Sequence, residues 1–153
     1  MPLRVPLEES ALLKGLAPAV LAKIRGLAKE ERFENGATIF TEGDPAEDLY
    51  ILGEGEVELS YVIPSNSPVT IRITRIEPGE TFGWSAVTGA ARLTAEARAL
   101  SETSAYLIHA RRLIEIMDSD PPSGYLVMTR LAQLIAKRLR DTRNELRWIQ
   151  SAI

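Results

Sequence analysis

The chain has 153 residues, a formal net charge of −3, and fractions of apolar (45%) and charged (25%) residues that are typical of one globular domain with its own core. It contains no cysteine, which excludes a disulfide framework, a thiolate metal site and a cysteine nucleophile. The N-terminus Met1–Val5 lacks the apolar segment of a signal peptide and no run of about 18 apolar residues is present, so we expect a cytoplasmic protein without a membrane span.

Residues 8–30 carry the pattern of amphipathic helices. Apolar residues recur three and four positions apart from Leu12 to Leu27, and Pro18 marks the start of a second helical segment after the break at Gly15. We therefore predict N-terminal helices over residues 8–30.

Residues 32–109 contain a series of short segments rich in β-branched and aromatic residues. Glycine, proline and asparagine separate these segments, and residues 64–68 predict a hairpin loop. Short strands at regular intervals are typical of an antiparallel sandwich or barrel. The predicted strands are 37–41, 49–52, 57–62, 69–76 and 105–108.

The segment Pro78–Val87 stands out within this strand region. A glycine turn at Gly83 precedes a predicted short helix, whose backbone N–H groups at Ser85 and Ala86 could point toward an anion. Arg92 follows, and its guanidinium can hold a phosphate with two parallel hydrogen bonds. The pattern therefore predicts a phosphate-binding cassette.

The C-terminal part of the chain is predicted to be helical. A short helix over 110–117 is followed by the break Asp120-Pro121-Pro122 and then by one long helix over about 122–151. This helix has a heptad pattern, which is typical of a coiled-coil seam. A helix of about 30 residues is roughly 45 Å long, longer than a small β-roll can cover. One set of seam positions holds Tyr125, Ala132, Leu139, Leu146 and Ile153, and the other holds Met128, Ile135, Thr142 and Ile149.

Two interpretations of the long helix stay open. We predict that it forms a homodimer interface through Met128, Ile135, Leu139, Thr142, Leu146 and Ile149; the alternative is a helix that packs on its own β-roll. Its basic residues alternate with acids, which favours a solvated face over a DNA-contacting surface. These basic residues are Lys137, Arg138, Arg140, Arg143 and Arg147.

The order of these features resembles the cyclic nucleotide-binding domain family, of the catabolite activator protein type. The residues that carry the resemblance are Gly36, the corner Glu42-Gly43-Asp44, Tyr50-Ile51-Leu52 leading to Gly55, Pro78-Gly79, Phe82-Gly83 and Arg92. The resemblance implies one domain over 1–153, mainly β with flanking helices. In this fold a double-stranded β-helix jelly roll (32–109) lies between N-terminal helices (8–30) and C-terminal helices (110–151). It also implies a cyclic nucleoside monophosphate in the roll, with the long helix closing over the base and often pairing two subunits.

The cassette departs from the family pattern at several positions. Trp84 stands where the family has a glutamate for the ribose 2′-hydroxyl, and an indole N–H can only donate. Leu93, followed by Thr94, replaces a small or hydroxyl residue, and the stretch from Gly83 to Arg92 is about one residue short. Losing one buried charged partner costs about 2–3 kcal/mol, or roughly 30- to 150-fold in affinity. We therefore expect weakened binding of cyclic AMP or cyclic GMP.

Several residues admit a second interpretation. Arg92 binds an anion, forms an ion pair with Glu80 or Glu96, or faces water. Trp84 plugs the sugar site, belongs to an altered pocket, or is a core tryptophan. We assign no catalytic and no metal-binding residue and predict no enzyme, because His109 has no metal cluster around it and Ser85 has no adjacent base.

These features predict a stand-alone regulatory module that binds a cyclic nucleotide-like ligand with degenerate or altered specificity and passes its signal to a partner protein. The chain stops at Ile153, where transcription factors of the family continue into a helix-turn-helix, so we expect no DNA-binding domain. Two alternatives remain open. One is a scaffold that has lost ligand binding, and the other is a fragment of a ligand-responsive transcription regulator.

Overall fold

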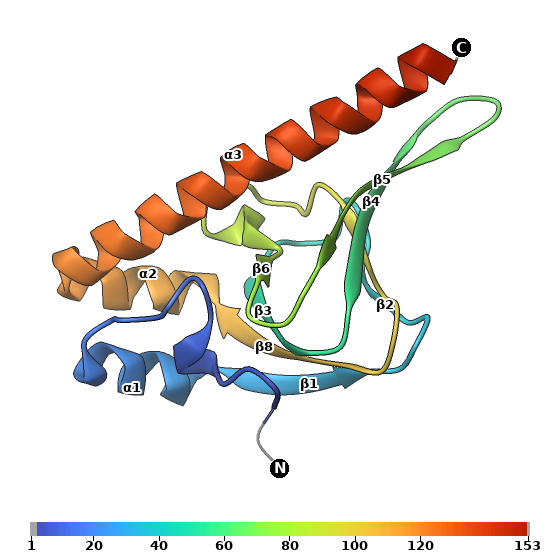
Figure 1. Ribbon diagram of the computed structural model, residues 1–153. Coiled ribbons are helices and arrows are strands. Elements are labelled where there is room, and N and C mark those ends of the chain that lie inside the picture. The colour runs from blue at the N-terminus through green and yellow to red at the C-terminus, as the bar shows by residue number, and fades with distance from the viewer. Residues whose placement is uncertain (1–2, 153) are drawn as a thin grey trace.

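A computed structural model describes residues 3–152 of the chain and the side chains of residues 3–148. Figure 1 shows a β-roll with helices at one end and a long helix across one side. In chain order the elements are η1 (Leu7–Glu9), α1 (Pro18–Leu27), β1 (Lys29–Phe33), β2 (Thr38–Phe40), β3 (Asp48–Glu54), β4 (Val57–Ile63), β5 (Val69–Ile76), β6 (Thr81–Phe82), η2 (Trp84–Ala86), β7 (Glu96–Ala99), β8 (Thr103–His109), α2 (Ala110–Ser119) and α3 (Pro121–Ala152).

The strands form two four-stranded antiparallel sheets, which confirms the predicted jelly roll. One sheet has the order β1-β8-β3-β6 and the other the order β2-β7-β4-β5. The predicted hairpin loop 64–68 joins β4 to β5, which are paired from Val57↔Ile76 to Ile63↔Val69.

The N-terminal boundary of the roll differs from the prediction. The helix predicted over 8–30 is a single 3-10 turn, a series of turns, and the ten-residue helix α1. Helix α1 ends at Leu27, the backbone of Ala28 is extended, and residues 29 and 30 already belong to β1. β1 pairs with β8 from Lys29↔Leu107 onward, so the roll starts at residue 29 rather than 32. Strands β6 and β7 were also absent from the predicted set.

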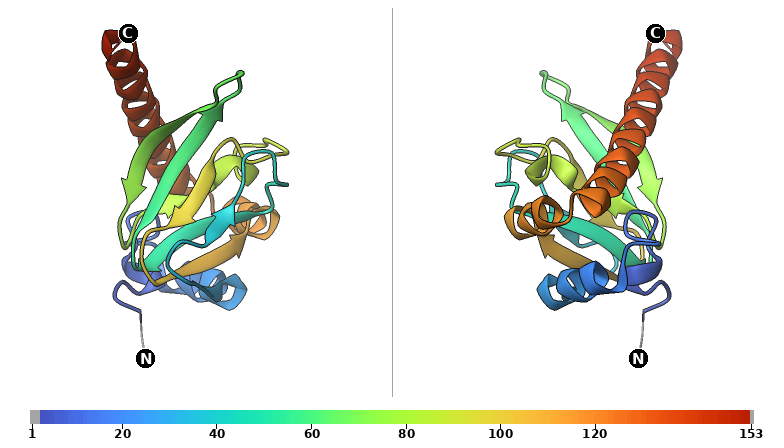
Figure 2. Two further views of the ribbon diagram at one scale, coloured as in Figure 1. Left: turned by 90° about the vertical axis from the view of Figure 1, so that its right-hand side faces the viewer. Right: turned by 90° about the vertical axis from the view of Figure 1, so that its left-hand side faces the viewer.

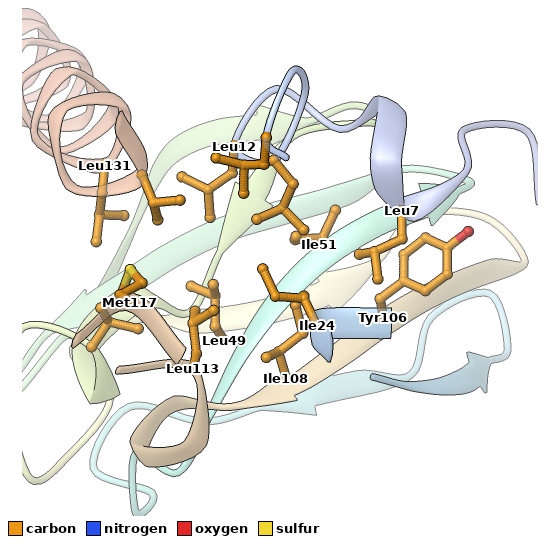
Figure 3. Close-up of a cluster of buried hydrophobic side chains, with 14 of the residues drawn as sticks. Leu7, Leu12, Ile24, Leu49, Ile51, Tyr106, Ile108, Leu113, Met117 and Leu131 are labelled. Carbon is orange, nitrogen blue, oxygen red and sulfur yellow. The ribbon is translucent and has the colours of Figure 1, made fainter. Parts of the chain in front are cut away.

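Two apolar clusters hold the elements together because β3 and β8 present different residues on their two faces. Leu52 and Ala105 face the interior of the roll, where they meet Phe40, Leu59 and Phe82. The opposite face packs against the helices, as Figure 3 shows. That outer cluster includes Leu49, Ile51 and Ile108 from the sheet with Ile24, Leu113 and Leu131 from the helices.

The junction between α2 and α3 is fixed by Asp120, which caps α3. The Ser123 backbone N–H donates to Asp120 Oδ2 over 3.3 Å, and the Ser123 hydroxyl donates to the same oxygen. Gly124 lets the helices approach, since an added Cβ would lie 3.0 Å from the Met117 carbonyl oxygen. Helix α3 contacts α2 and β5. Figure 2 shows its C-terminal end standing clear of the roll.

Replacing Gly55 with alanine should lower the free energy of unfolding by about 2–4 kcal/mol. Gly55 has a φ of +94°, and an added Cβ would lie 2.6 Å from the Glu102 carbonyl oxygen. The matched control is Gly36→Ala, where φ is +87° but no atom lies within 4 Å of the added Cβ. That control should cost about 1 kcal/mol. Urea denaturation of both variants measures the difference, and equal costs would contradict the packing argument.

Candidate ligand site at the cassette and the long helix

The cassette backbone is fixed by Gly83 and the aromatic side chains beneath it. Gly83 is left-handed, with φ 67° and ψ 37°, and opens the three-residue 3-10 helix η2. An added Cβ at Gly83 would lie 2.6 Å from Tyr50 Cδ1, so only glycine fits there. The Tyr50 ring stacks on Phe82 with centroids 5.1 Å apart. Burial, with smaller contributions from nearby carboxylates, raises the pKa of Tyr50 to about 12.

The space beneath the cassette is nearly filled. A cavity of only about 30 Å³ remains there, comparable with the volume of one water molecule in the liquid. The Leu93 side chain is 5% exposed and belongs to the core inside the roll. Ser85 is buried and Ala86 half-buried, and η2 ends after one turn. The cavity is lined by Phe40, Leu59, Gly83, Trp84, Ser85, Leu93, Thr94 and Ala95.

Arg92 lies outside this space. Its side chain is exposed, and Nη1 donates a hydrogen bond to the Gly43 carbonyl oxygen over 2.8 Å. Backbone hydrogen bonds also tie the neighbouring residues to the 43–46 corner: Gly43 N–H donates to Leu93 O, and Leu93 N–H to Asp44 O, each over 2.8 Å. Arg92 thus holds the β2–β3 corner in this conformation. Neither Glu80 nor Glu96 is its ion-pair partner, because each lies near another arginine.

A larger cavity of about 350 Å³ lies between the roll and α3. It joins two of the predicted cassette residues, Trp84 and Thr94, to three residues of the predicted helix seam, Ile135, Leu139 and Thr142. The Thr142 hydroxyl donates to the Arg138 carbonyl oxygen one turn earlier, over 2.9 Å. The remaining lining residues are Leu59, Tyr61, Ile73, Ala95 and Arg138.

Arg138 also lines this cavity. The prediction that it lies on a solvated basic face is wrong. It is 4% exposed. None of its three guanidinium nitrogens has a hydrogen-bond partner among the described residues. The nearest carboxylate oxygens are Asp141 Oδ2 at 3.6 Å and Glu80 Oε2 at 3.9 Å. Burial lowers the pKa of the Arg138 guanidinium, and the charges of Glu80 and Asp141 partly oppose this effect.

The helical spacing carried a signal for the burial of Arg138. Counting back along α3, Arg138 lies four residues after Leu134, seven after Leu131 and eleven after Val127. Val127 and Leu131 are buried, and Leu134 packs against the same cluster. Arg138 therefore continues the stripe that faces the protein. The charge of Arg138 and its neighbours predicted exposure, whereas this spacing indicates burial.

The residues of the predicted seam differ in their exposure. Met128, Leu139 and Leu146 are 42%, 58% and 37% exposed. Ile135 and Thr142 are half-buried against the cavity. Tyr125 and Trp148 add to the exposed apolar surface. The side chain of Ile149 lies outside the described part of the chain.

The remaining candidates form no reactive cluster. His109 is exposed and precedes α2. Within residues 3–148 there is no group of three or more His, Cys, Asp or Glu side chains placed to hold a metal ion. Among the described helices, none combines the length and apolar character that crossing a bilayer requires.

Comparison with known proteins gives consistent matches. A family model described as cyclic nucleotide-binding domain matches residues 30–120. Glutaminase 1 of Bradyrhizobium diazoefficiens is 29% identical over 133 residues, which is 87% of this chain but 21% of that protein. The CRP-like cAMP-activated global transcriptional regulator of Mycobacterium tuberculosis is 26% identical over 140 residues, which is 92% of this chain and 60% of the regulator.

A solved structure agrees with the sequence matches. The catabolite activator protein of Thermus thermophilus superposes with a TM-score of 0.71 at 27% identity, over 92% of this chain and 63% of that one. The chain thus spans less than two thirds of these two curated relatives and of this solved structure.

Replacing Arg138 with methionine should raise the free energy of unfolding by about 1–3 kcal/mol. A buried charge with only distant partners is destabilising, and an apolar side chain of similar length removes that cost. Glu80 and Asp141 are 29% and 27% exposed at their side chains, so water can solvate them once the guanidinium is gone. Thermal and urea denaturation measure the change.

The control for this prediction is Arg140→Met, because Arg140 lies two residues along the same helix and is exposed. It should change stability by less than about 0.5 kcal/mol. A marked loss of stability in Arg138→Met would show instead that the two longer ion pairs hold α3 in place.

Proposed function

Because residues 30–120 match its model, this chain belongs to the cyclic nucleotide-binding domain family, and from that premise we propose that it is a dimeric regulatory module with altered ligand specificity. The module has no catalytic role in this proposal. It binds a small ligand between the roll and α3 and passes the change to a partner protein.

The filled cassette carries the proposal of altered specificity. A cyclic phosphate and its ribose need more room than the cavity of roughly 30 Å³ beneath Gly83, which shares Leu59, Trp84, Thr94 and Ala95 with the cavity of about 350 Å³ beside α3. Trp84 and Leu93 line that space, and Arg92 is engaged with the Gly43 carbonyl outside it. A cyclic nucleotide could enter in the family's manner only if the indole, the leucine and the arginine all moved.

The cavity at Arg138 favours a ligand-binding module over a scaffold that has lost its ligand. A protein that had only filled its pocket would gain stability by replacing a buried guanidinium that has only two long ion pairs with an apolar side chain. This chain keeps the guanidinium beside an open cavity of about 350 Å³. That volume lies within the range of small-molecule sites.

The exposed surface of α3 supports dimerisation. Met128, Leu139 and Leu146 repeat at seam positions and are more than a third exposed. The 32 residues of α3 correspond to a helix of roughly 48 Å, and Figure 2 shows its C-terminal part beyond the roll. A second copy of α3 packed along this seam would remove these side chains from water.

The proposed seam and the cavity share residues, so a ligand in the cavity can affect dimer assembly. Ile135, Leu139 and Thr142 are seam positions and also line the cavity. A ligand that contacts them changes the surface that a second α3 meets, so ligand affinity and dimer affinity become linked. The output then belongs to a protein that recognises the dimer. A DNA-binding segment in the same polypeptide, as the name of the mycobacterial regulator suggests for that protein, would serve equally.

Calorimetric titration with cyclic AMP and cyclic GMP tests the altered specificity. We expect no saturable heat from either nucleotide up to about 1 mM, because at least two favourable contacts of the family site are missing. The double variant Trp84→Glu with Leu93→Ser should gain at least about 30-fold in affinity, since it restores a carboxylate and clears space. Wild-type binding in the micromolar range that Arg92→Ala abolishes would overturn this proposal.

Sedimentation of the protein at tens of micromolar tests the dimer. Wild type should sediment as a dimer, and Leu139→Asp combined with Leu146→Asp should sediment as a monomer, because a charge buried in the seam has no partner. The control is Asn144→Asp, an exposed position on the opposite side of the heptad pattern, which should stay dimeric. A monomeric wild type would rule out the dimer.

A further inference from the structure

The charged side chains of α3 alternate in the sequence but separate in space. Positions three, four and seven residues apart share one face of a helix. Asp141 pairs with the buried Arg138 over 3.6 Å, and Glu145, seven residues after Arg138, is half-buried on the same side. The exposed basic residues on the side away from the roll, called the basic stripe below, are Lys137, Arg140, Arg143 and Arg147.

Three members of the basic stripe have no ion-pair partner among the described side chains of residues 3–148. Within that part of the chain, no carboxylate oxygen lies within 4 Å of Lys137, Arg140 or Arg143. An arginine on the strands of the roll behaves differently, since Arg72 pairs with Glu58 on the neighbouring strand over 3.1 Å. The stripe therefore gathers positive charge that the protein itself does not neutralise.

The stability of α3 does not account for this clustering. Like charges three or four positions apart destabilise a helix, and the stripe contains three such pairs. Cations favour the negative end of the helix dipole only within the last turn. Helix α3 continues to Ala152, nine residues beyond Arg143, so the dipole does not stabilise most of the stripe. Carboxylates placed along the stripe by another molecule would relieve the repulsion.

A second copy of the chain cannot dock stripe to stripe. A two-fold contact brings the same surface of both subunits together, which here would place like charges side by side. The proposed seam uses Leu139 and Leu146, which lie on a different side of α3, so dimer formation and the stripe do not exclude each other. Figure 2 shows that the C-terminal part of α3, which carries the stripe, stands clear of the roll.

An acidic protein segment matches the stripe better than a nucleic acid does. Residues 137–147 hold five basic and two acidic residues, whereas the rest of the chain holds 13 basic and 19 acidic ones. A polyanion with one charge per nucleotide would be repelled by that acidic remainder, and the stripe could neutralise only a few phosphates. An acidic helix carries carboxylates three and four residues apart, which is the spacing of the stripe along α3.

We propose that the basic stripe of α3 is the docking surface for an acidic helical segment of the partner protein. Arg140 and Arg143 can each hold a carboxylate with two hydrogen bonds, and Lys137 adds a compact charge. Complementary charge of this kind mainly sets the choice of partner and the rate of association. This inference rests on the proposed function, in which the module passes its signal to a partner protein.

Fluorescence anisotropy with a labelled, alanine-based helical peptide tests the inference. The peptide has four glutamates at positions i, i+3, i+7 and i+10, and a control peptide of the same composition has them spread around the helix. At about 20 mM salt, the first peptide should bind with a dissociation constant below about 1 mM, and at least about threefold more tightly than the control peptide. Binding should weaken at least about fivefold at about 200 mM salt.

Two double substitutions separate the position of the charges from the net charge of the protein. Lys137→Gln with Arg140→Gln should weaken binding of the first peptide at least about fivefold. Lys14→Gln with Lys23→Gln removes the same charge at exposed positions far from α3 and should change binding less than about twofold. Asn144→Asp places a carboxylate within the stripe, and it should weaken binding at least about twofold while the protein stays dimeric. Equal melting temperatures check that the variants are folded.

Several results would overturn the inference. These are no binding of the first peptide below about 1 mM, equal binding of both peptides, or an equal loss in both double variants. A DNA duplex that binds more tightly than the peptide, and loses affinity in Lys137→Gln with Arg140→Gln, would make the partner a nucleic acid. A change in dimerisation of that variant without any peptide would show that a second copy occupies the stripe.

The same samples distinguish a failure of this inference from a failure of the proposed function. Saturable binding of cyclic AMP that depends on Arg92 would overturn altered specificity, and a monomeric wild type would overturn the dimer. Neither result involves the stripe, which the acidic peptide and its variants judge separately. If the peptide does not bind, the inference about the stripe fails while altered specificity and the dimer stand.

Discussion

The close contact between Gly83 and the aromatic side chains of the roll is the constraint on which the rest of the site depends. Phe40 comes from one sheet, and Tyr50 and Phe82 come from the other, with ring centroids 5.1 to 6.0 Å apart. Gly83 lies on Tyr50 with no room for a Cβ. The cassette is therefore held where the two sheets meet, and the residue after Gly83 must point where Trp84 points. Its indole then lines both the small cavity in the roll and the larger cavity beside α3.

The arginine that lines the larger cavity is therefore Arg138 of α3 and not Arg92 of the cassette. Arg92 leaves the interior because Leu93, the next residue, occupies it, and the guanidinium contacts the Gly43 carbonyl at the surface. Arg138 of α3 lines the larger cavity together with Trp84, and its guanidinium has two long ion pairs, with Glu80 and Asp141. A buried cation that lines this cavity is thus on α3, the helix for which we propose a dimer interface. A ligand held there would act on α3 directly.

The sequence predicted the helices that have a repeating residue pattern and the turns that need a glycine with positive φ. Glycines with positive φ, such as Gly36, Gly55 and Gly83, marked the turns of the roll, and proline and heptad spacing marked α3. The sequence did not predict strand β1, because Lys29–Phe33 consists almost entirely of charged residues. Its pairing with β8 depends on backbone hydrogen bonds. The burial of Arg138 was not predicted, because a charged side chain is normally exposed. Only its helical spacing from Leu131 placed it inside.

The proposed coupling between the cavity and dimer formation depends on how α3 is held against the rest of the protein. Its first half is fixed by the outer core, through Val127 and Leu131. Helix α3 also contacts β5, and beyond Leu134 it carries the two long ion pairs of Arg138, while Leu139, Leu146 and Trp148 are more than a third exposed. Because Ile135, Leu139 and Thr142 line the cavity and also belong to the proposed dimer seam, a small change in the direction of α3 there would alter the surface that a second subunit would meet. In the proposed dimer, binding of a ligand in this cavity would therefore be linked to the association of the two subunits.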